Sequence, residues 1–219
     1  NKFDAFQLNG AAYVSNEFRM SSKLRSILGL RVEKFNLYYT GKNSQQDLFL
    51  NNELLIDKLD LFPTANLIYE VNENASFRVA YYKTTARPSF KEASIAEIYD
   101  PLEDITFNGN INIKPSYIDN IDIRYENYGE NAQMFAVSAF YKRFKDPIEL
   151  SFVKASTSNI TPLNLGDANV YGVEFELRKN LGFINGFDVF DININASLIE
   201  AFQKFSDDEL ELREKGLRT

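Results

Sequence analysis

The residues of this chain that could carry out chemistry are mainly carboxylates and tyrosines, because the sequence contains neither cysteine nor histidine. Their absence excludes disulfides, thiolate nucleophiles, Ser-His and Cys-His pairs, and transition metals held by cysteine or histidine. The 219 residues carry a net charge of −7 and lack the basic surface that phosphate contacts require. An enzyme would have to work with carboxylates, lysines, tyrosines or a Ser-Lys pair, and we expect no cofactor, no bound metal and no nucleic-acid partner.

The densest group of carboxylates is EIYDPLED, in which Glu97, Asp100, Glu103 and Asp104 surround Tyr99. Carboxylate oxygens gathered in a loop could bind calcium or a cationic ligand. The spacing does not match the ligand pattern of an EF-hand loop, so a solvated acidic loop is the simpler interpretation.

A second pair of carboxylates, Glu174 and Glu176, is separated by one residue and would share one face of a β-strand. Two carboxylates on one surface could serve as the acid and the nucleophile of a glycosidase. Fixed charges that line a wet face of a sheet are the simpler interpretation here too.

Eight stretches alternate between apolar and polar side chains, which predicts β-strands with one apolar face, and a helical period fits none of them better. They cover residues 4–15, 23–35, 60–71, 76–86, 117–129, 132–144, 170–181 and 191–199. Most of them reach the length of about 9–11 residues that a tilted strand needs to cross a bilayer.

The connections between these stretches alternate in length. Short polar turns at 16–22, 72–74, 129–131 and 180–186 alternate with long linkers at 39–59, 86–116 and 145–169. This asymmetry is typical of an up-and-down membrane barrel with short periplasmic turns and long outer loops. A soluble β-sandwich has shorter strands, of about 5–6 residues, and no such difference between its ends.

The two faces of the expected strands differ in character. We assign the apolar face, with Phe77, Val79 and Tyr81 on one strand and Val173, Phe175 and Leu177 on another, to lipid. The opposite face is assigned to the lumen, and its charged residues are Arg78, Arg124, Glu126, Glu174, Glu176 and Arg178.

Four segments, in this order, resemble the barrel of TonB-dependent outer-membrane receptors of the Bacteroidetes type. Residues 61–92 contain PTANLIY, similar to a P-x-x-N-L-x-Y strand, followed by RPSFKE, similar to the R-P-S-F-x-E end of the next strand. Residues 108–128 resemble a G-N-x-x-L-K/x-P loop entry with the strand that follows it. Residues 137–149 and 169–181 resemble the family's S-x-F-Y-K hairpin and its Y-G-x-E-x-E-x-R-K strand.

The resemblance implies an all-β fold, an antiparallel up-and-down transmembrane β-barrel in the bacterial outer membrane. Residues 1–219 would supply about eight of the roughly 22 strands of a large plugged barrel. The plug domain and the final barrel strands are expected to lie outside this chain.

The same resemblance implies uptake rather than catalysis. A scarce solute, such as an iron chelate, a cofactor, a glycan or a peptide, would bind at the outer loops and the lumen and would then enter the periplasm. The implied partners are the solute, the lipid bilayer and the TonB–ExbB–ExbD complex, which acts through the plug. A surface lipoprotein that forms a lid is a further partner in the glycan-importing branch of the family.

The linker 86–116 is the expected ligand-binding loop. Its candidate residues, together with the arginine at its start, are Arg87, Glu97, Tyr99, Asp100, Asp104, Asn108 and Asn110. Pro88 should end the preceding strand because proline cannot donate to a β-ladder. A local ion pair at the strand end is the simpler role for Arg87.

Two other classes of protein remain open from the sequence. One is a complete small outer-membrane barrel of eight strands that acts as an adhesin or a structural protein. The other is a soluble, calcium-binding β-sandwich, whose two sheets would bury the phenylalanines and tyrosines against each other.

Overall fold

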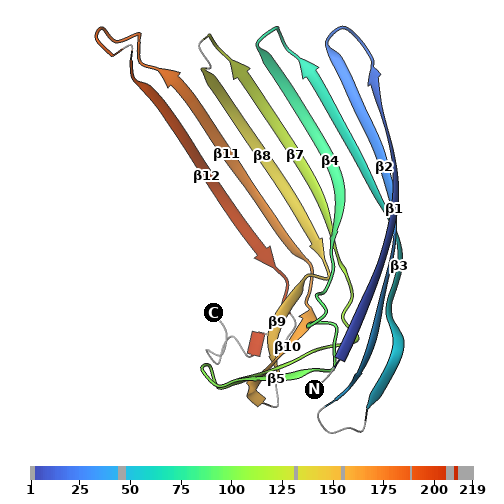
Figure 1. Ribbon diagram of the computed structural model, residues 1–219. Helices are drawn as coiled ribbons and strands as arrows, with labels where there is room; N and C mark the ends of the chain where they lie inside the picture. The colour runs from blue at the N-terminus through green and yellow to red at the C-terminus, as the bar shows by residue number, and fades with distance from the viewer. Residues whose placement is uncertain are drawn as a thin grey trace.

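The computed structural model describes residues 3–43, 48–130, 133–153, 156–187, 189–205 and 210–211. Its main element is an antiparallel sheet in the order β1-β2-β3-β4-β7-β8-β11-β12, which curves through space as an open trough (Figure 1). The strands are β1 (Phe3–Arg19), β2 (Leu24–Lys42), β3 (Phe49–Glu70), β4 (Ala75–Ala86), β7 (Ser116–Tyr128), β8 (Met134–Lys145), β11 (Ala168–Asn180) and β12 (Asp191–Gln203).

The eight strands predicted from alternation are thus all present, and each lies beside its neighbour in chain order. The turns after β1, β3, β7 and β11 lie at one end of the trough, and the long loops after β4 and β8 lie at the other, where β2 ends and β3 begins (Figure 1). No helix in the described part of the chain combines the length and the apolar character needed to span a membrane.

The expected linker at 39–59 is wrong, because β2 continues to Lys42 and β3 begins at Phe49. Two register shifts in this hairpin, after Leu37 and after Tyr39, interrupt the period of two that sequence reading depends on. The face that is apolar nearer the short turns becomes polar in this hairpin, where Lys34 forms an ion pair with Asp57. The hairpin therefore extends beyond the apolar belt into a wet environment.

The other two linkers contain strands of their own. A small sheet has the strand order β5-β6-β10-β9. Its strands are β5 (Glu97–Asp100), β6 (Ile105–Asn108), β9 (Ile148–Val153) and β10 (Ser156–Asn164). Its β6–β10 contact is parallel, whereas every pair of the main sheet is antiparallel. This small sheet lies at the long-loop end of the trough (Figure 1).

A buried apolar cluster fastens the 87–115 segment to the main sheet. Phe35 and Leu37 of β2 and Ile56 of β3 pack with Ala93 and Ile113 of the loop. The cluster is small, and most phenylalanines and tyrosines of the main sheet lie outside it. The two sheets therefore do not form the sandwich in which those aromatic residues would be buried against each other.

The convex face of the main sheet exposes its apolar side chains. Phe77 and Tyr125 lie opposite each other on β4 and β7, and Val173 lies beside Ala139 on β11 and β8. Phe77 and Val173 are 39% and 50% exposed, although both belong to strands that are paired on both sides. Such a continuous apolar surface needs a nonaqueous neighbour.

A row of three tyrosines ends this apolar belt toward the long loops. Their hydroxyl groups donate to polar side chains: Tyr81 to Asp119 at 2.8 Å, Tyr141 to Asn169 at 2.6 Å and Tyr171 to Glu200 at 2.7 Å. Aromatic girdles of this kind mark the water interface of membrane barrels, because the ring is apolar and the hydroxyl group is hydrated.

One seam interrupts the wall. β3 and β4 pair only between Thr64↔Tyr82 and Glu70↔Ser76, whereas β4 pairs with β7 along its whole length, from Ala75↔Asn127 to Ala86↔Ser116. Beyond Thr64, the edge of β3 that faces β4 has no ladder partner among the described residues. The ladder between β3 and β4 therefore ends at Thr64↔Tyr82, short of the long loops.

Candidate functional site

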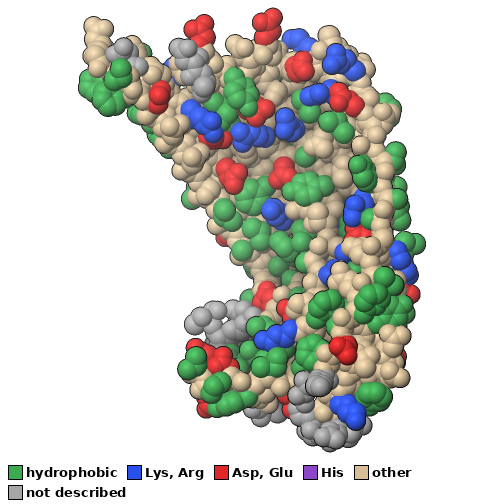
Figure 2. All heavy atoms as spheres, in the orientation of Figure 1, with side chains coloured by type: hydrophobic (Ala, Val, Ile, Leu, Met, Phe, Trp, Pro, Cys, Tyr) green, Lys and Arg blue, Asp and Glu red, His purple; other side chains and the backbone are tan. Residues whose placement is uncertain are grey.

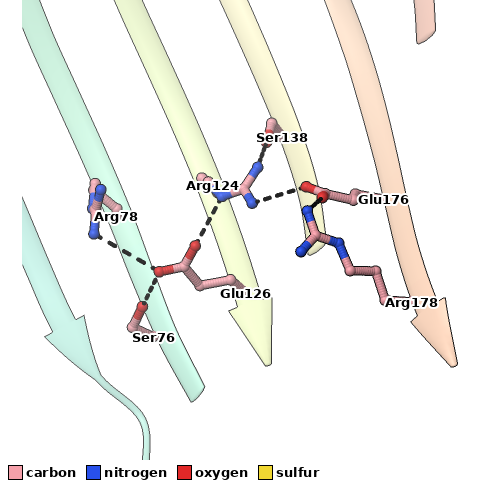
Figure 3. A network of polar contacts seen from close by, with 7 residues as sticks. All are labelled: Ser76, Arg78, Arg124, Glu126, Ser138, Glu176 and Arg178. Atoms are coloured by element: carbon pink, nitrogen blue, oxygen red, sulfur yellow. Dashed lines mark hydrogen bonds and ion pairs between the residues drawn. The ribbon is translucent and has the colours of Figure 1, made fainter. Parts of the chain in front are cut away.

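The concave face of the main sheet carries a ladder of alternating charges that crosses from β4 to β11 (Figure 3). Arg78 Nη2 lies 3.7 Å from Glu126 Oε1, and Arg124 Nε lies 2.9 Å from Glu126 Oε2. Arg124 Nη2 lies 3.4 Å from Glu176 Oε2, and Arg178 Nη2 lies 2.8 Å from Glu176 Oε1. Figure 2 shows acidic and basic side chains mixed across this face of the molecule.

The register explains the alternation. Arg78 and Arg124 lie directly opposite each other on β4 and β7, where like charges repel. Glu126, two residues along β7, contacts both of them and offsets that repulsion. Two hydroxyl groups complete the ladder: Ser76 donates to Glu126 at 3.1 Å, and Ser138 accepts from Arg124 at 2.9 Å.

Glu176 is the acidic centre of the ladder on β11, with one arginine at each of its oxygens. Glu174 lies on the same face and lines a hollow of about 270 Å³ with Arg124 and Ser138. The two glutamates share a face, as their spacing predicts, and both line this hollow.

Arg87 lies elsewhere, at the loop end of the trough, and its side chain is only 18% exposed. Its guanidinium group forms an ion pair with Glu33, lies 4.0 Å from Asp60 and stacks 4.3 Å above the ring centroid of Phe35. Glu33 and Asp60 belong to the hairpin β2–β3, whereas Arg87 begins the loop after β4. Arg87 therefore connects the two sides of the seam.

Tyr117, near the loop end of β7, adds a second connection across the seam. Its hydroxyl group donates to Asp60 Oδ1 at 2.7 Å. We refer to Glu33, Asp60, Arg87 and Tyr117 together as the seam latch.

The acidic hairpin β5–β6 places most of the other predicted ligand residues at the surface. Glu97, Tyr99, Asp100 and Asp104 are exposed, and Glu97 lies opposite Asn108 in the register. Tyr99 donates to Asp104 at 3.0 Å, which raises the pKa of Tyr99. In the part of the chain that the structure describes, no group of three or more acidic residues is arranged to hold a metal ion.

Asn110 has a structural position at the base of the same loop. Its side-chain amide donates to the carbonyl group of Pro162 at 3.0 Å, and its carbonyl oxygen accepts from the backbone of Asn112 at 3.0 Å. Asn110 therefore ties the loop 87–115 to β10 of the small sheet. The structure does not bring Arg87 and Asn110 together with the exposed acidic hairpin.

A hollow of about 990 Å³ at the loop end of the concave face was not predicted from the sequence. Its walls are mostly apolar and come from the ends of five main-sheet strands and the start of β9. They include Ala86, Ser116, Phe144, Ile148, Ala168, Val170, Ala201 and Gln203. The side-chain nitrogen of Gln203 is buried and has no hydrogen-bond partner.

Residues 1–216 match the family model described as the outer membrane protein β-barrel family. The chain belongs to this family. The membership accounts for the exposed apolar belt and the tyrosine row, since the convex face of an outer-membrane barrel contacts lipid. This barrel segment is therefore a bacterial outer-membrane protein.

Solved structures show the same fold at low sequence identity. The copper transporter OprC matches with a TM-score of 0.68 at 18% identity, over 94% of this chain and 30% of that chain. The hemophore receptor HasR of Serratia marcescens gives 0.68 at 13% identity, over 89% of this chain and 34% of that chain. The siderophore receptor PirA of Pseudomonas aeruginosa gives 0.62 at 12% identity, over 91% of this chain and 44% of that chain. No curated protein matches the sequence significantly.

The chain thus spans between 30% and 44% of the length of these structures. At such identities the similarity shows the fold and not the ligand.

Proposed function

We propose that this chain forms part of the β-barrel of a TonB-dependent outer-membrane receptor of the Bacteroidetes type. Such a receptor binds a scarce solute from outside the cell and imports it into the periplasm. The energy would come from the TonB–ExbB–ExbD complex through a plug domain, and a surface lipoprotein could cover the outer end. Family membership and the four sequence motifs support this proposal.

The observation that carries the proposal is the hollow of about 990 Å³ on the concave face, at the end with the long loops. Its volume lies at the upper end of the range for small-molecule sites, about 300–1,000 Å³. Its apolar walls suit a carbon-rich part of the solute, and the free amide donor of Gln203 suits an acceptor oxygen on that solute.

The other candidate residues have separate roles in this proposal. The exposed hairpin, with Glu97, Tyr99, Asp100, Asp104 and Asn108, makes the first contact with the solute. Arg87 and Asn110 hold the base of that loop in place. The charge ladder lies deeper, where it faces the water-filled or plugged lumen as a set of fixed charges.

The alternative of a complete eight-stranded barrel has less support. β1 and β12 are the two ends of the strand order, and neither is paired with the other in the described residues. The main sheet is an open trough (Figure 1). A closed barrel of eight strands would also have an interior filled by side chains, with little space for a solute.

The direct test uses uptake by cells that express the full-length protein. Radiolabelled ferric chelates, cobalamin, oligosaccharides and peptides are offered to cells with and without TonB. We expect accumulation of one of these solutes only when both the receptor and TonB are present. Equal accumulation in the absence of TonB, or no receptor-dependent accumulation across the panel, would refute the proposal.

Removal of the acidic hairpin is expected to weaken solute capture. The backbone amide of Gly109 donates to Ala96 at 3.0 Å, so the neck of the hairpin is narrow and two glycines can replace residues 97–108. We expect the solute identified above to bind about tenfold more weakly, as loss of roughly 1.4 kcal/mol of contacts implies. Unchanged binding would remove the hairpin from the site.

Filling the hollow is expected to have a similar effect on binding. Ala168 lines the hollow, and Ala168→Trp would place a large ring within it. We expect at least about tenfold weaker binding of the same solute, measured by titration of the purified receptor. The control is Gln7→Trp, at an exposed position of the edge strand β1 and far along the sheet order from the hollow. Equal affinities for both variants would contradict this location.

A further inference from the structure

The connection between β11 and β12, residues 181–190, differs from the other turns at its end of the trough. The turns at 20–23 and 72–74 read MSSK and NEN, and the third, at 129–133, contains Gly129 and Glu130. The connection 181–190 instead exposes five apolar side chains. They are Phe183 (71%), Ile184 (43%), Phe187 (47%), Val189 (77%) and Phe190 (54%).

Backbone hydrogen bonds link the described residues of this connection, 181–187 and 189–190. Three successive backbone hydrogen bonds span three residues each: Ile184 N to Leu181 O at 2.8 Å, Phe187 N to Ile184 O at 3.0 Å and Phe190 N to Phe187 O at 3.1 Å. The residues joined by these bonds, Leu181, Ile184, Phe187 and Phe190, are all apolar. The ring centroids of Phe187 and Phe190 lie 5.6 Å apart. Gly186, at φ +84°, allows the reversal that most other residues would resist.

The apolar surface of this connection is continuous with the lipid-facing side of the wall. Leu177 lies opposite Ile194, Lys179 lies opposite Ile192, and the amide of Leu181 donates to Phe190 O at 2.8 Å. These pairs are alternate rungs of the ladder that contains Phe175↔Ala196, so their side chains lie on the same convex face as Phe175. Lys179 Nζ lies 6.0 Å from the ring centroid of Phe183, so a cation borders the aromatic group.

We propose that residues 181–190 form a membrane anchor that lies in the periplasm-side leaflet, at the boundary between headgroups and acyl chains. The rings of Phe183 and Phe187 enter the boundary, and Lys179 reaches the lipid phosphates. Aromatic side chains favour this depth, and lysine can extend its charge to the headgroups while its stem stays in an apolar environment. The anchor fixes the height of the β11–β12 hairpin in the bilayer.

The occupant is a lipid surface because the patch adjoins a face that already contacts lipid. A soluble periplasmic partner would need a patch separated from that face, bordered by polar residues. The family membership, and not the proposed uptake, supplies the membrane, so the anchor can be tested even if the solute proposal fails.

Tryptophan fluorescence can test the anchor, since these 219 residues contain no tryptophan and the signal from the rest of the full-length protein can be subtracted. Phe187→Trp is introduced into the full-length protein and reconstituted in phosphatidylethanolamine–phosphatidylglycerol vesicles, with and without dibrominated phosphatidylcholine. The emission of the unsubstituted protein is subtracted. The matched control is Glu73→Trp, in the polar turn between β3 and β4.

We expect the emission of Phe187→Trp to be shifted to the blue relative to Glu73→Trp and to be strongly quenched by the brominated lipid. Emission and quenching equal to those of the control would overturn the proposal, because the ring would then lie in water. A blue shift without quenching by brominated lipid would also overturn it, because the ring would then be covered by protein.

Discussion

Replacement of Phe175 by arginine should destabilise the folded barrel by about 2–4 kcal/mol, the cost of a cation on the lipid face near the middle of a bilayer. Phe175 lies on the convex face, with its ring 5.6 Å from that of Phe135. The free energy of unfolding is measured by denaturant titration of the full-length protein in lipid vesicles. The exchange also removes the aromatic contact, which adds to the loss.

The neighbouring residue provides the control for this experiment. Glu174 points to the opposite face of the same strand, where it lines a hollow with Arg124. Glu174→Gln changes charge on the wet side only and should alter stability by well under 1 kcal/mol, because surface charges contribute little. Equal effects for Phe175→Arg and Glu174→Gln would show that the two faces have been assigned wrongly.

Replacement of Arg87 by methionine should release the 87–115 segment from the wall. The change leaves Glu33 and Asp60 beside each other with no arginine from the loop, and both are largely buried. Removal of one partner from such a buried ion pair costs about 3 kcal/mol. The cost should appear as local opening, with exchange of the amides of Ala93 and Asn110 about 100-fold faster.

Two further variants separate the latch from a general loss of charge. Arg143 forms an exposed ion pair with Asp167, so Arg143→Met should leave the exchange of the same amides unchanged. The double variant Arg87→Met/Glu33→Gln should lose less stability than Arg87→Met. Arg31 still pairs with Glu33 at 2.9 Å, but Glu33 and Asp60 lie opposite each other as two buried negative charges, and the second change removes one of them. If Arg87→Met and Arg143→Met behave alike, the seam latch does not hold the loop.

The main sheet could be predicted because every one of its strands has a wet face and a greasy face. Stretches such as 117–129 therefore alternate with a period of two, and their order and approximate length follow. The charge ladder could be predicted in part for the same reason, since parity alone places Arg78, Arg124 and Glu176 on one face. The pairing among them depends on the register, which parity does not reveal.

The parts that could not be predicted lie where alternation has no physical cause. Residues 49–59 extend beyond the lipid, so their outer face is wet, while Ile56 on the other face packs against the 87–115 segment and register shifts interrupt the pattern. The strands β5, β6, β9 and β10 are short, and their pairing joins two loops that are distant in sequence. The hollow depends on small residues such as Ala86 and Ala168, whose meaning appears only when five strand ends converge.

Arg87 illustrates how a residue can be predicted in position but not in role. Pro88 ends the strand β4 at the expected place. The partners of Arg87, however, come from residues 33 and 60, which no local pattern connects to it. Contacts between residues so far apart in sequence require the folded sheet.

The seam between β3 and β4 gives the wall a mechanical weak line. Among the described residues, strands β3 and β4 form a ladder only from Thr64 to Glu70, next to their turn, so the sheet is less constrained near the loops. There the latch and the apolar cluster connect the two panels through side chains, so together they set how far β1–β3 can move against β4–β12. A movement of the two panels about this seam would therefore widen the loop end of the trough without breaking any backbone hydrogen bond between β3 and β4.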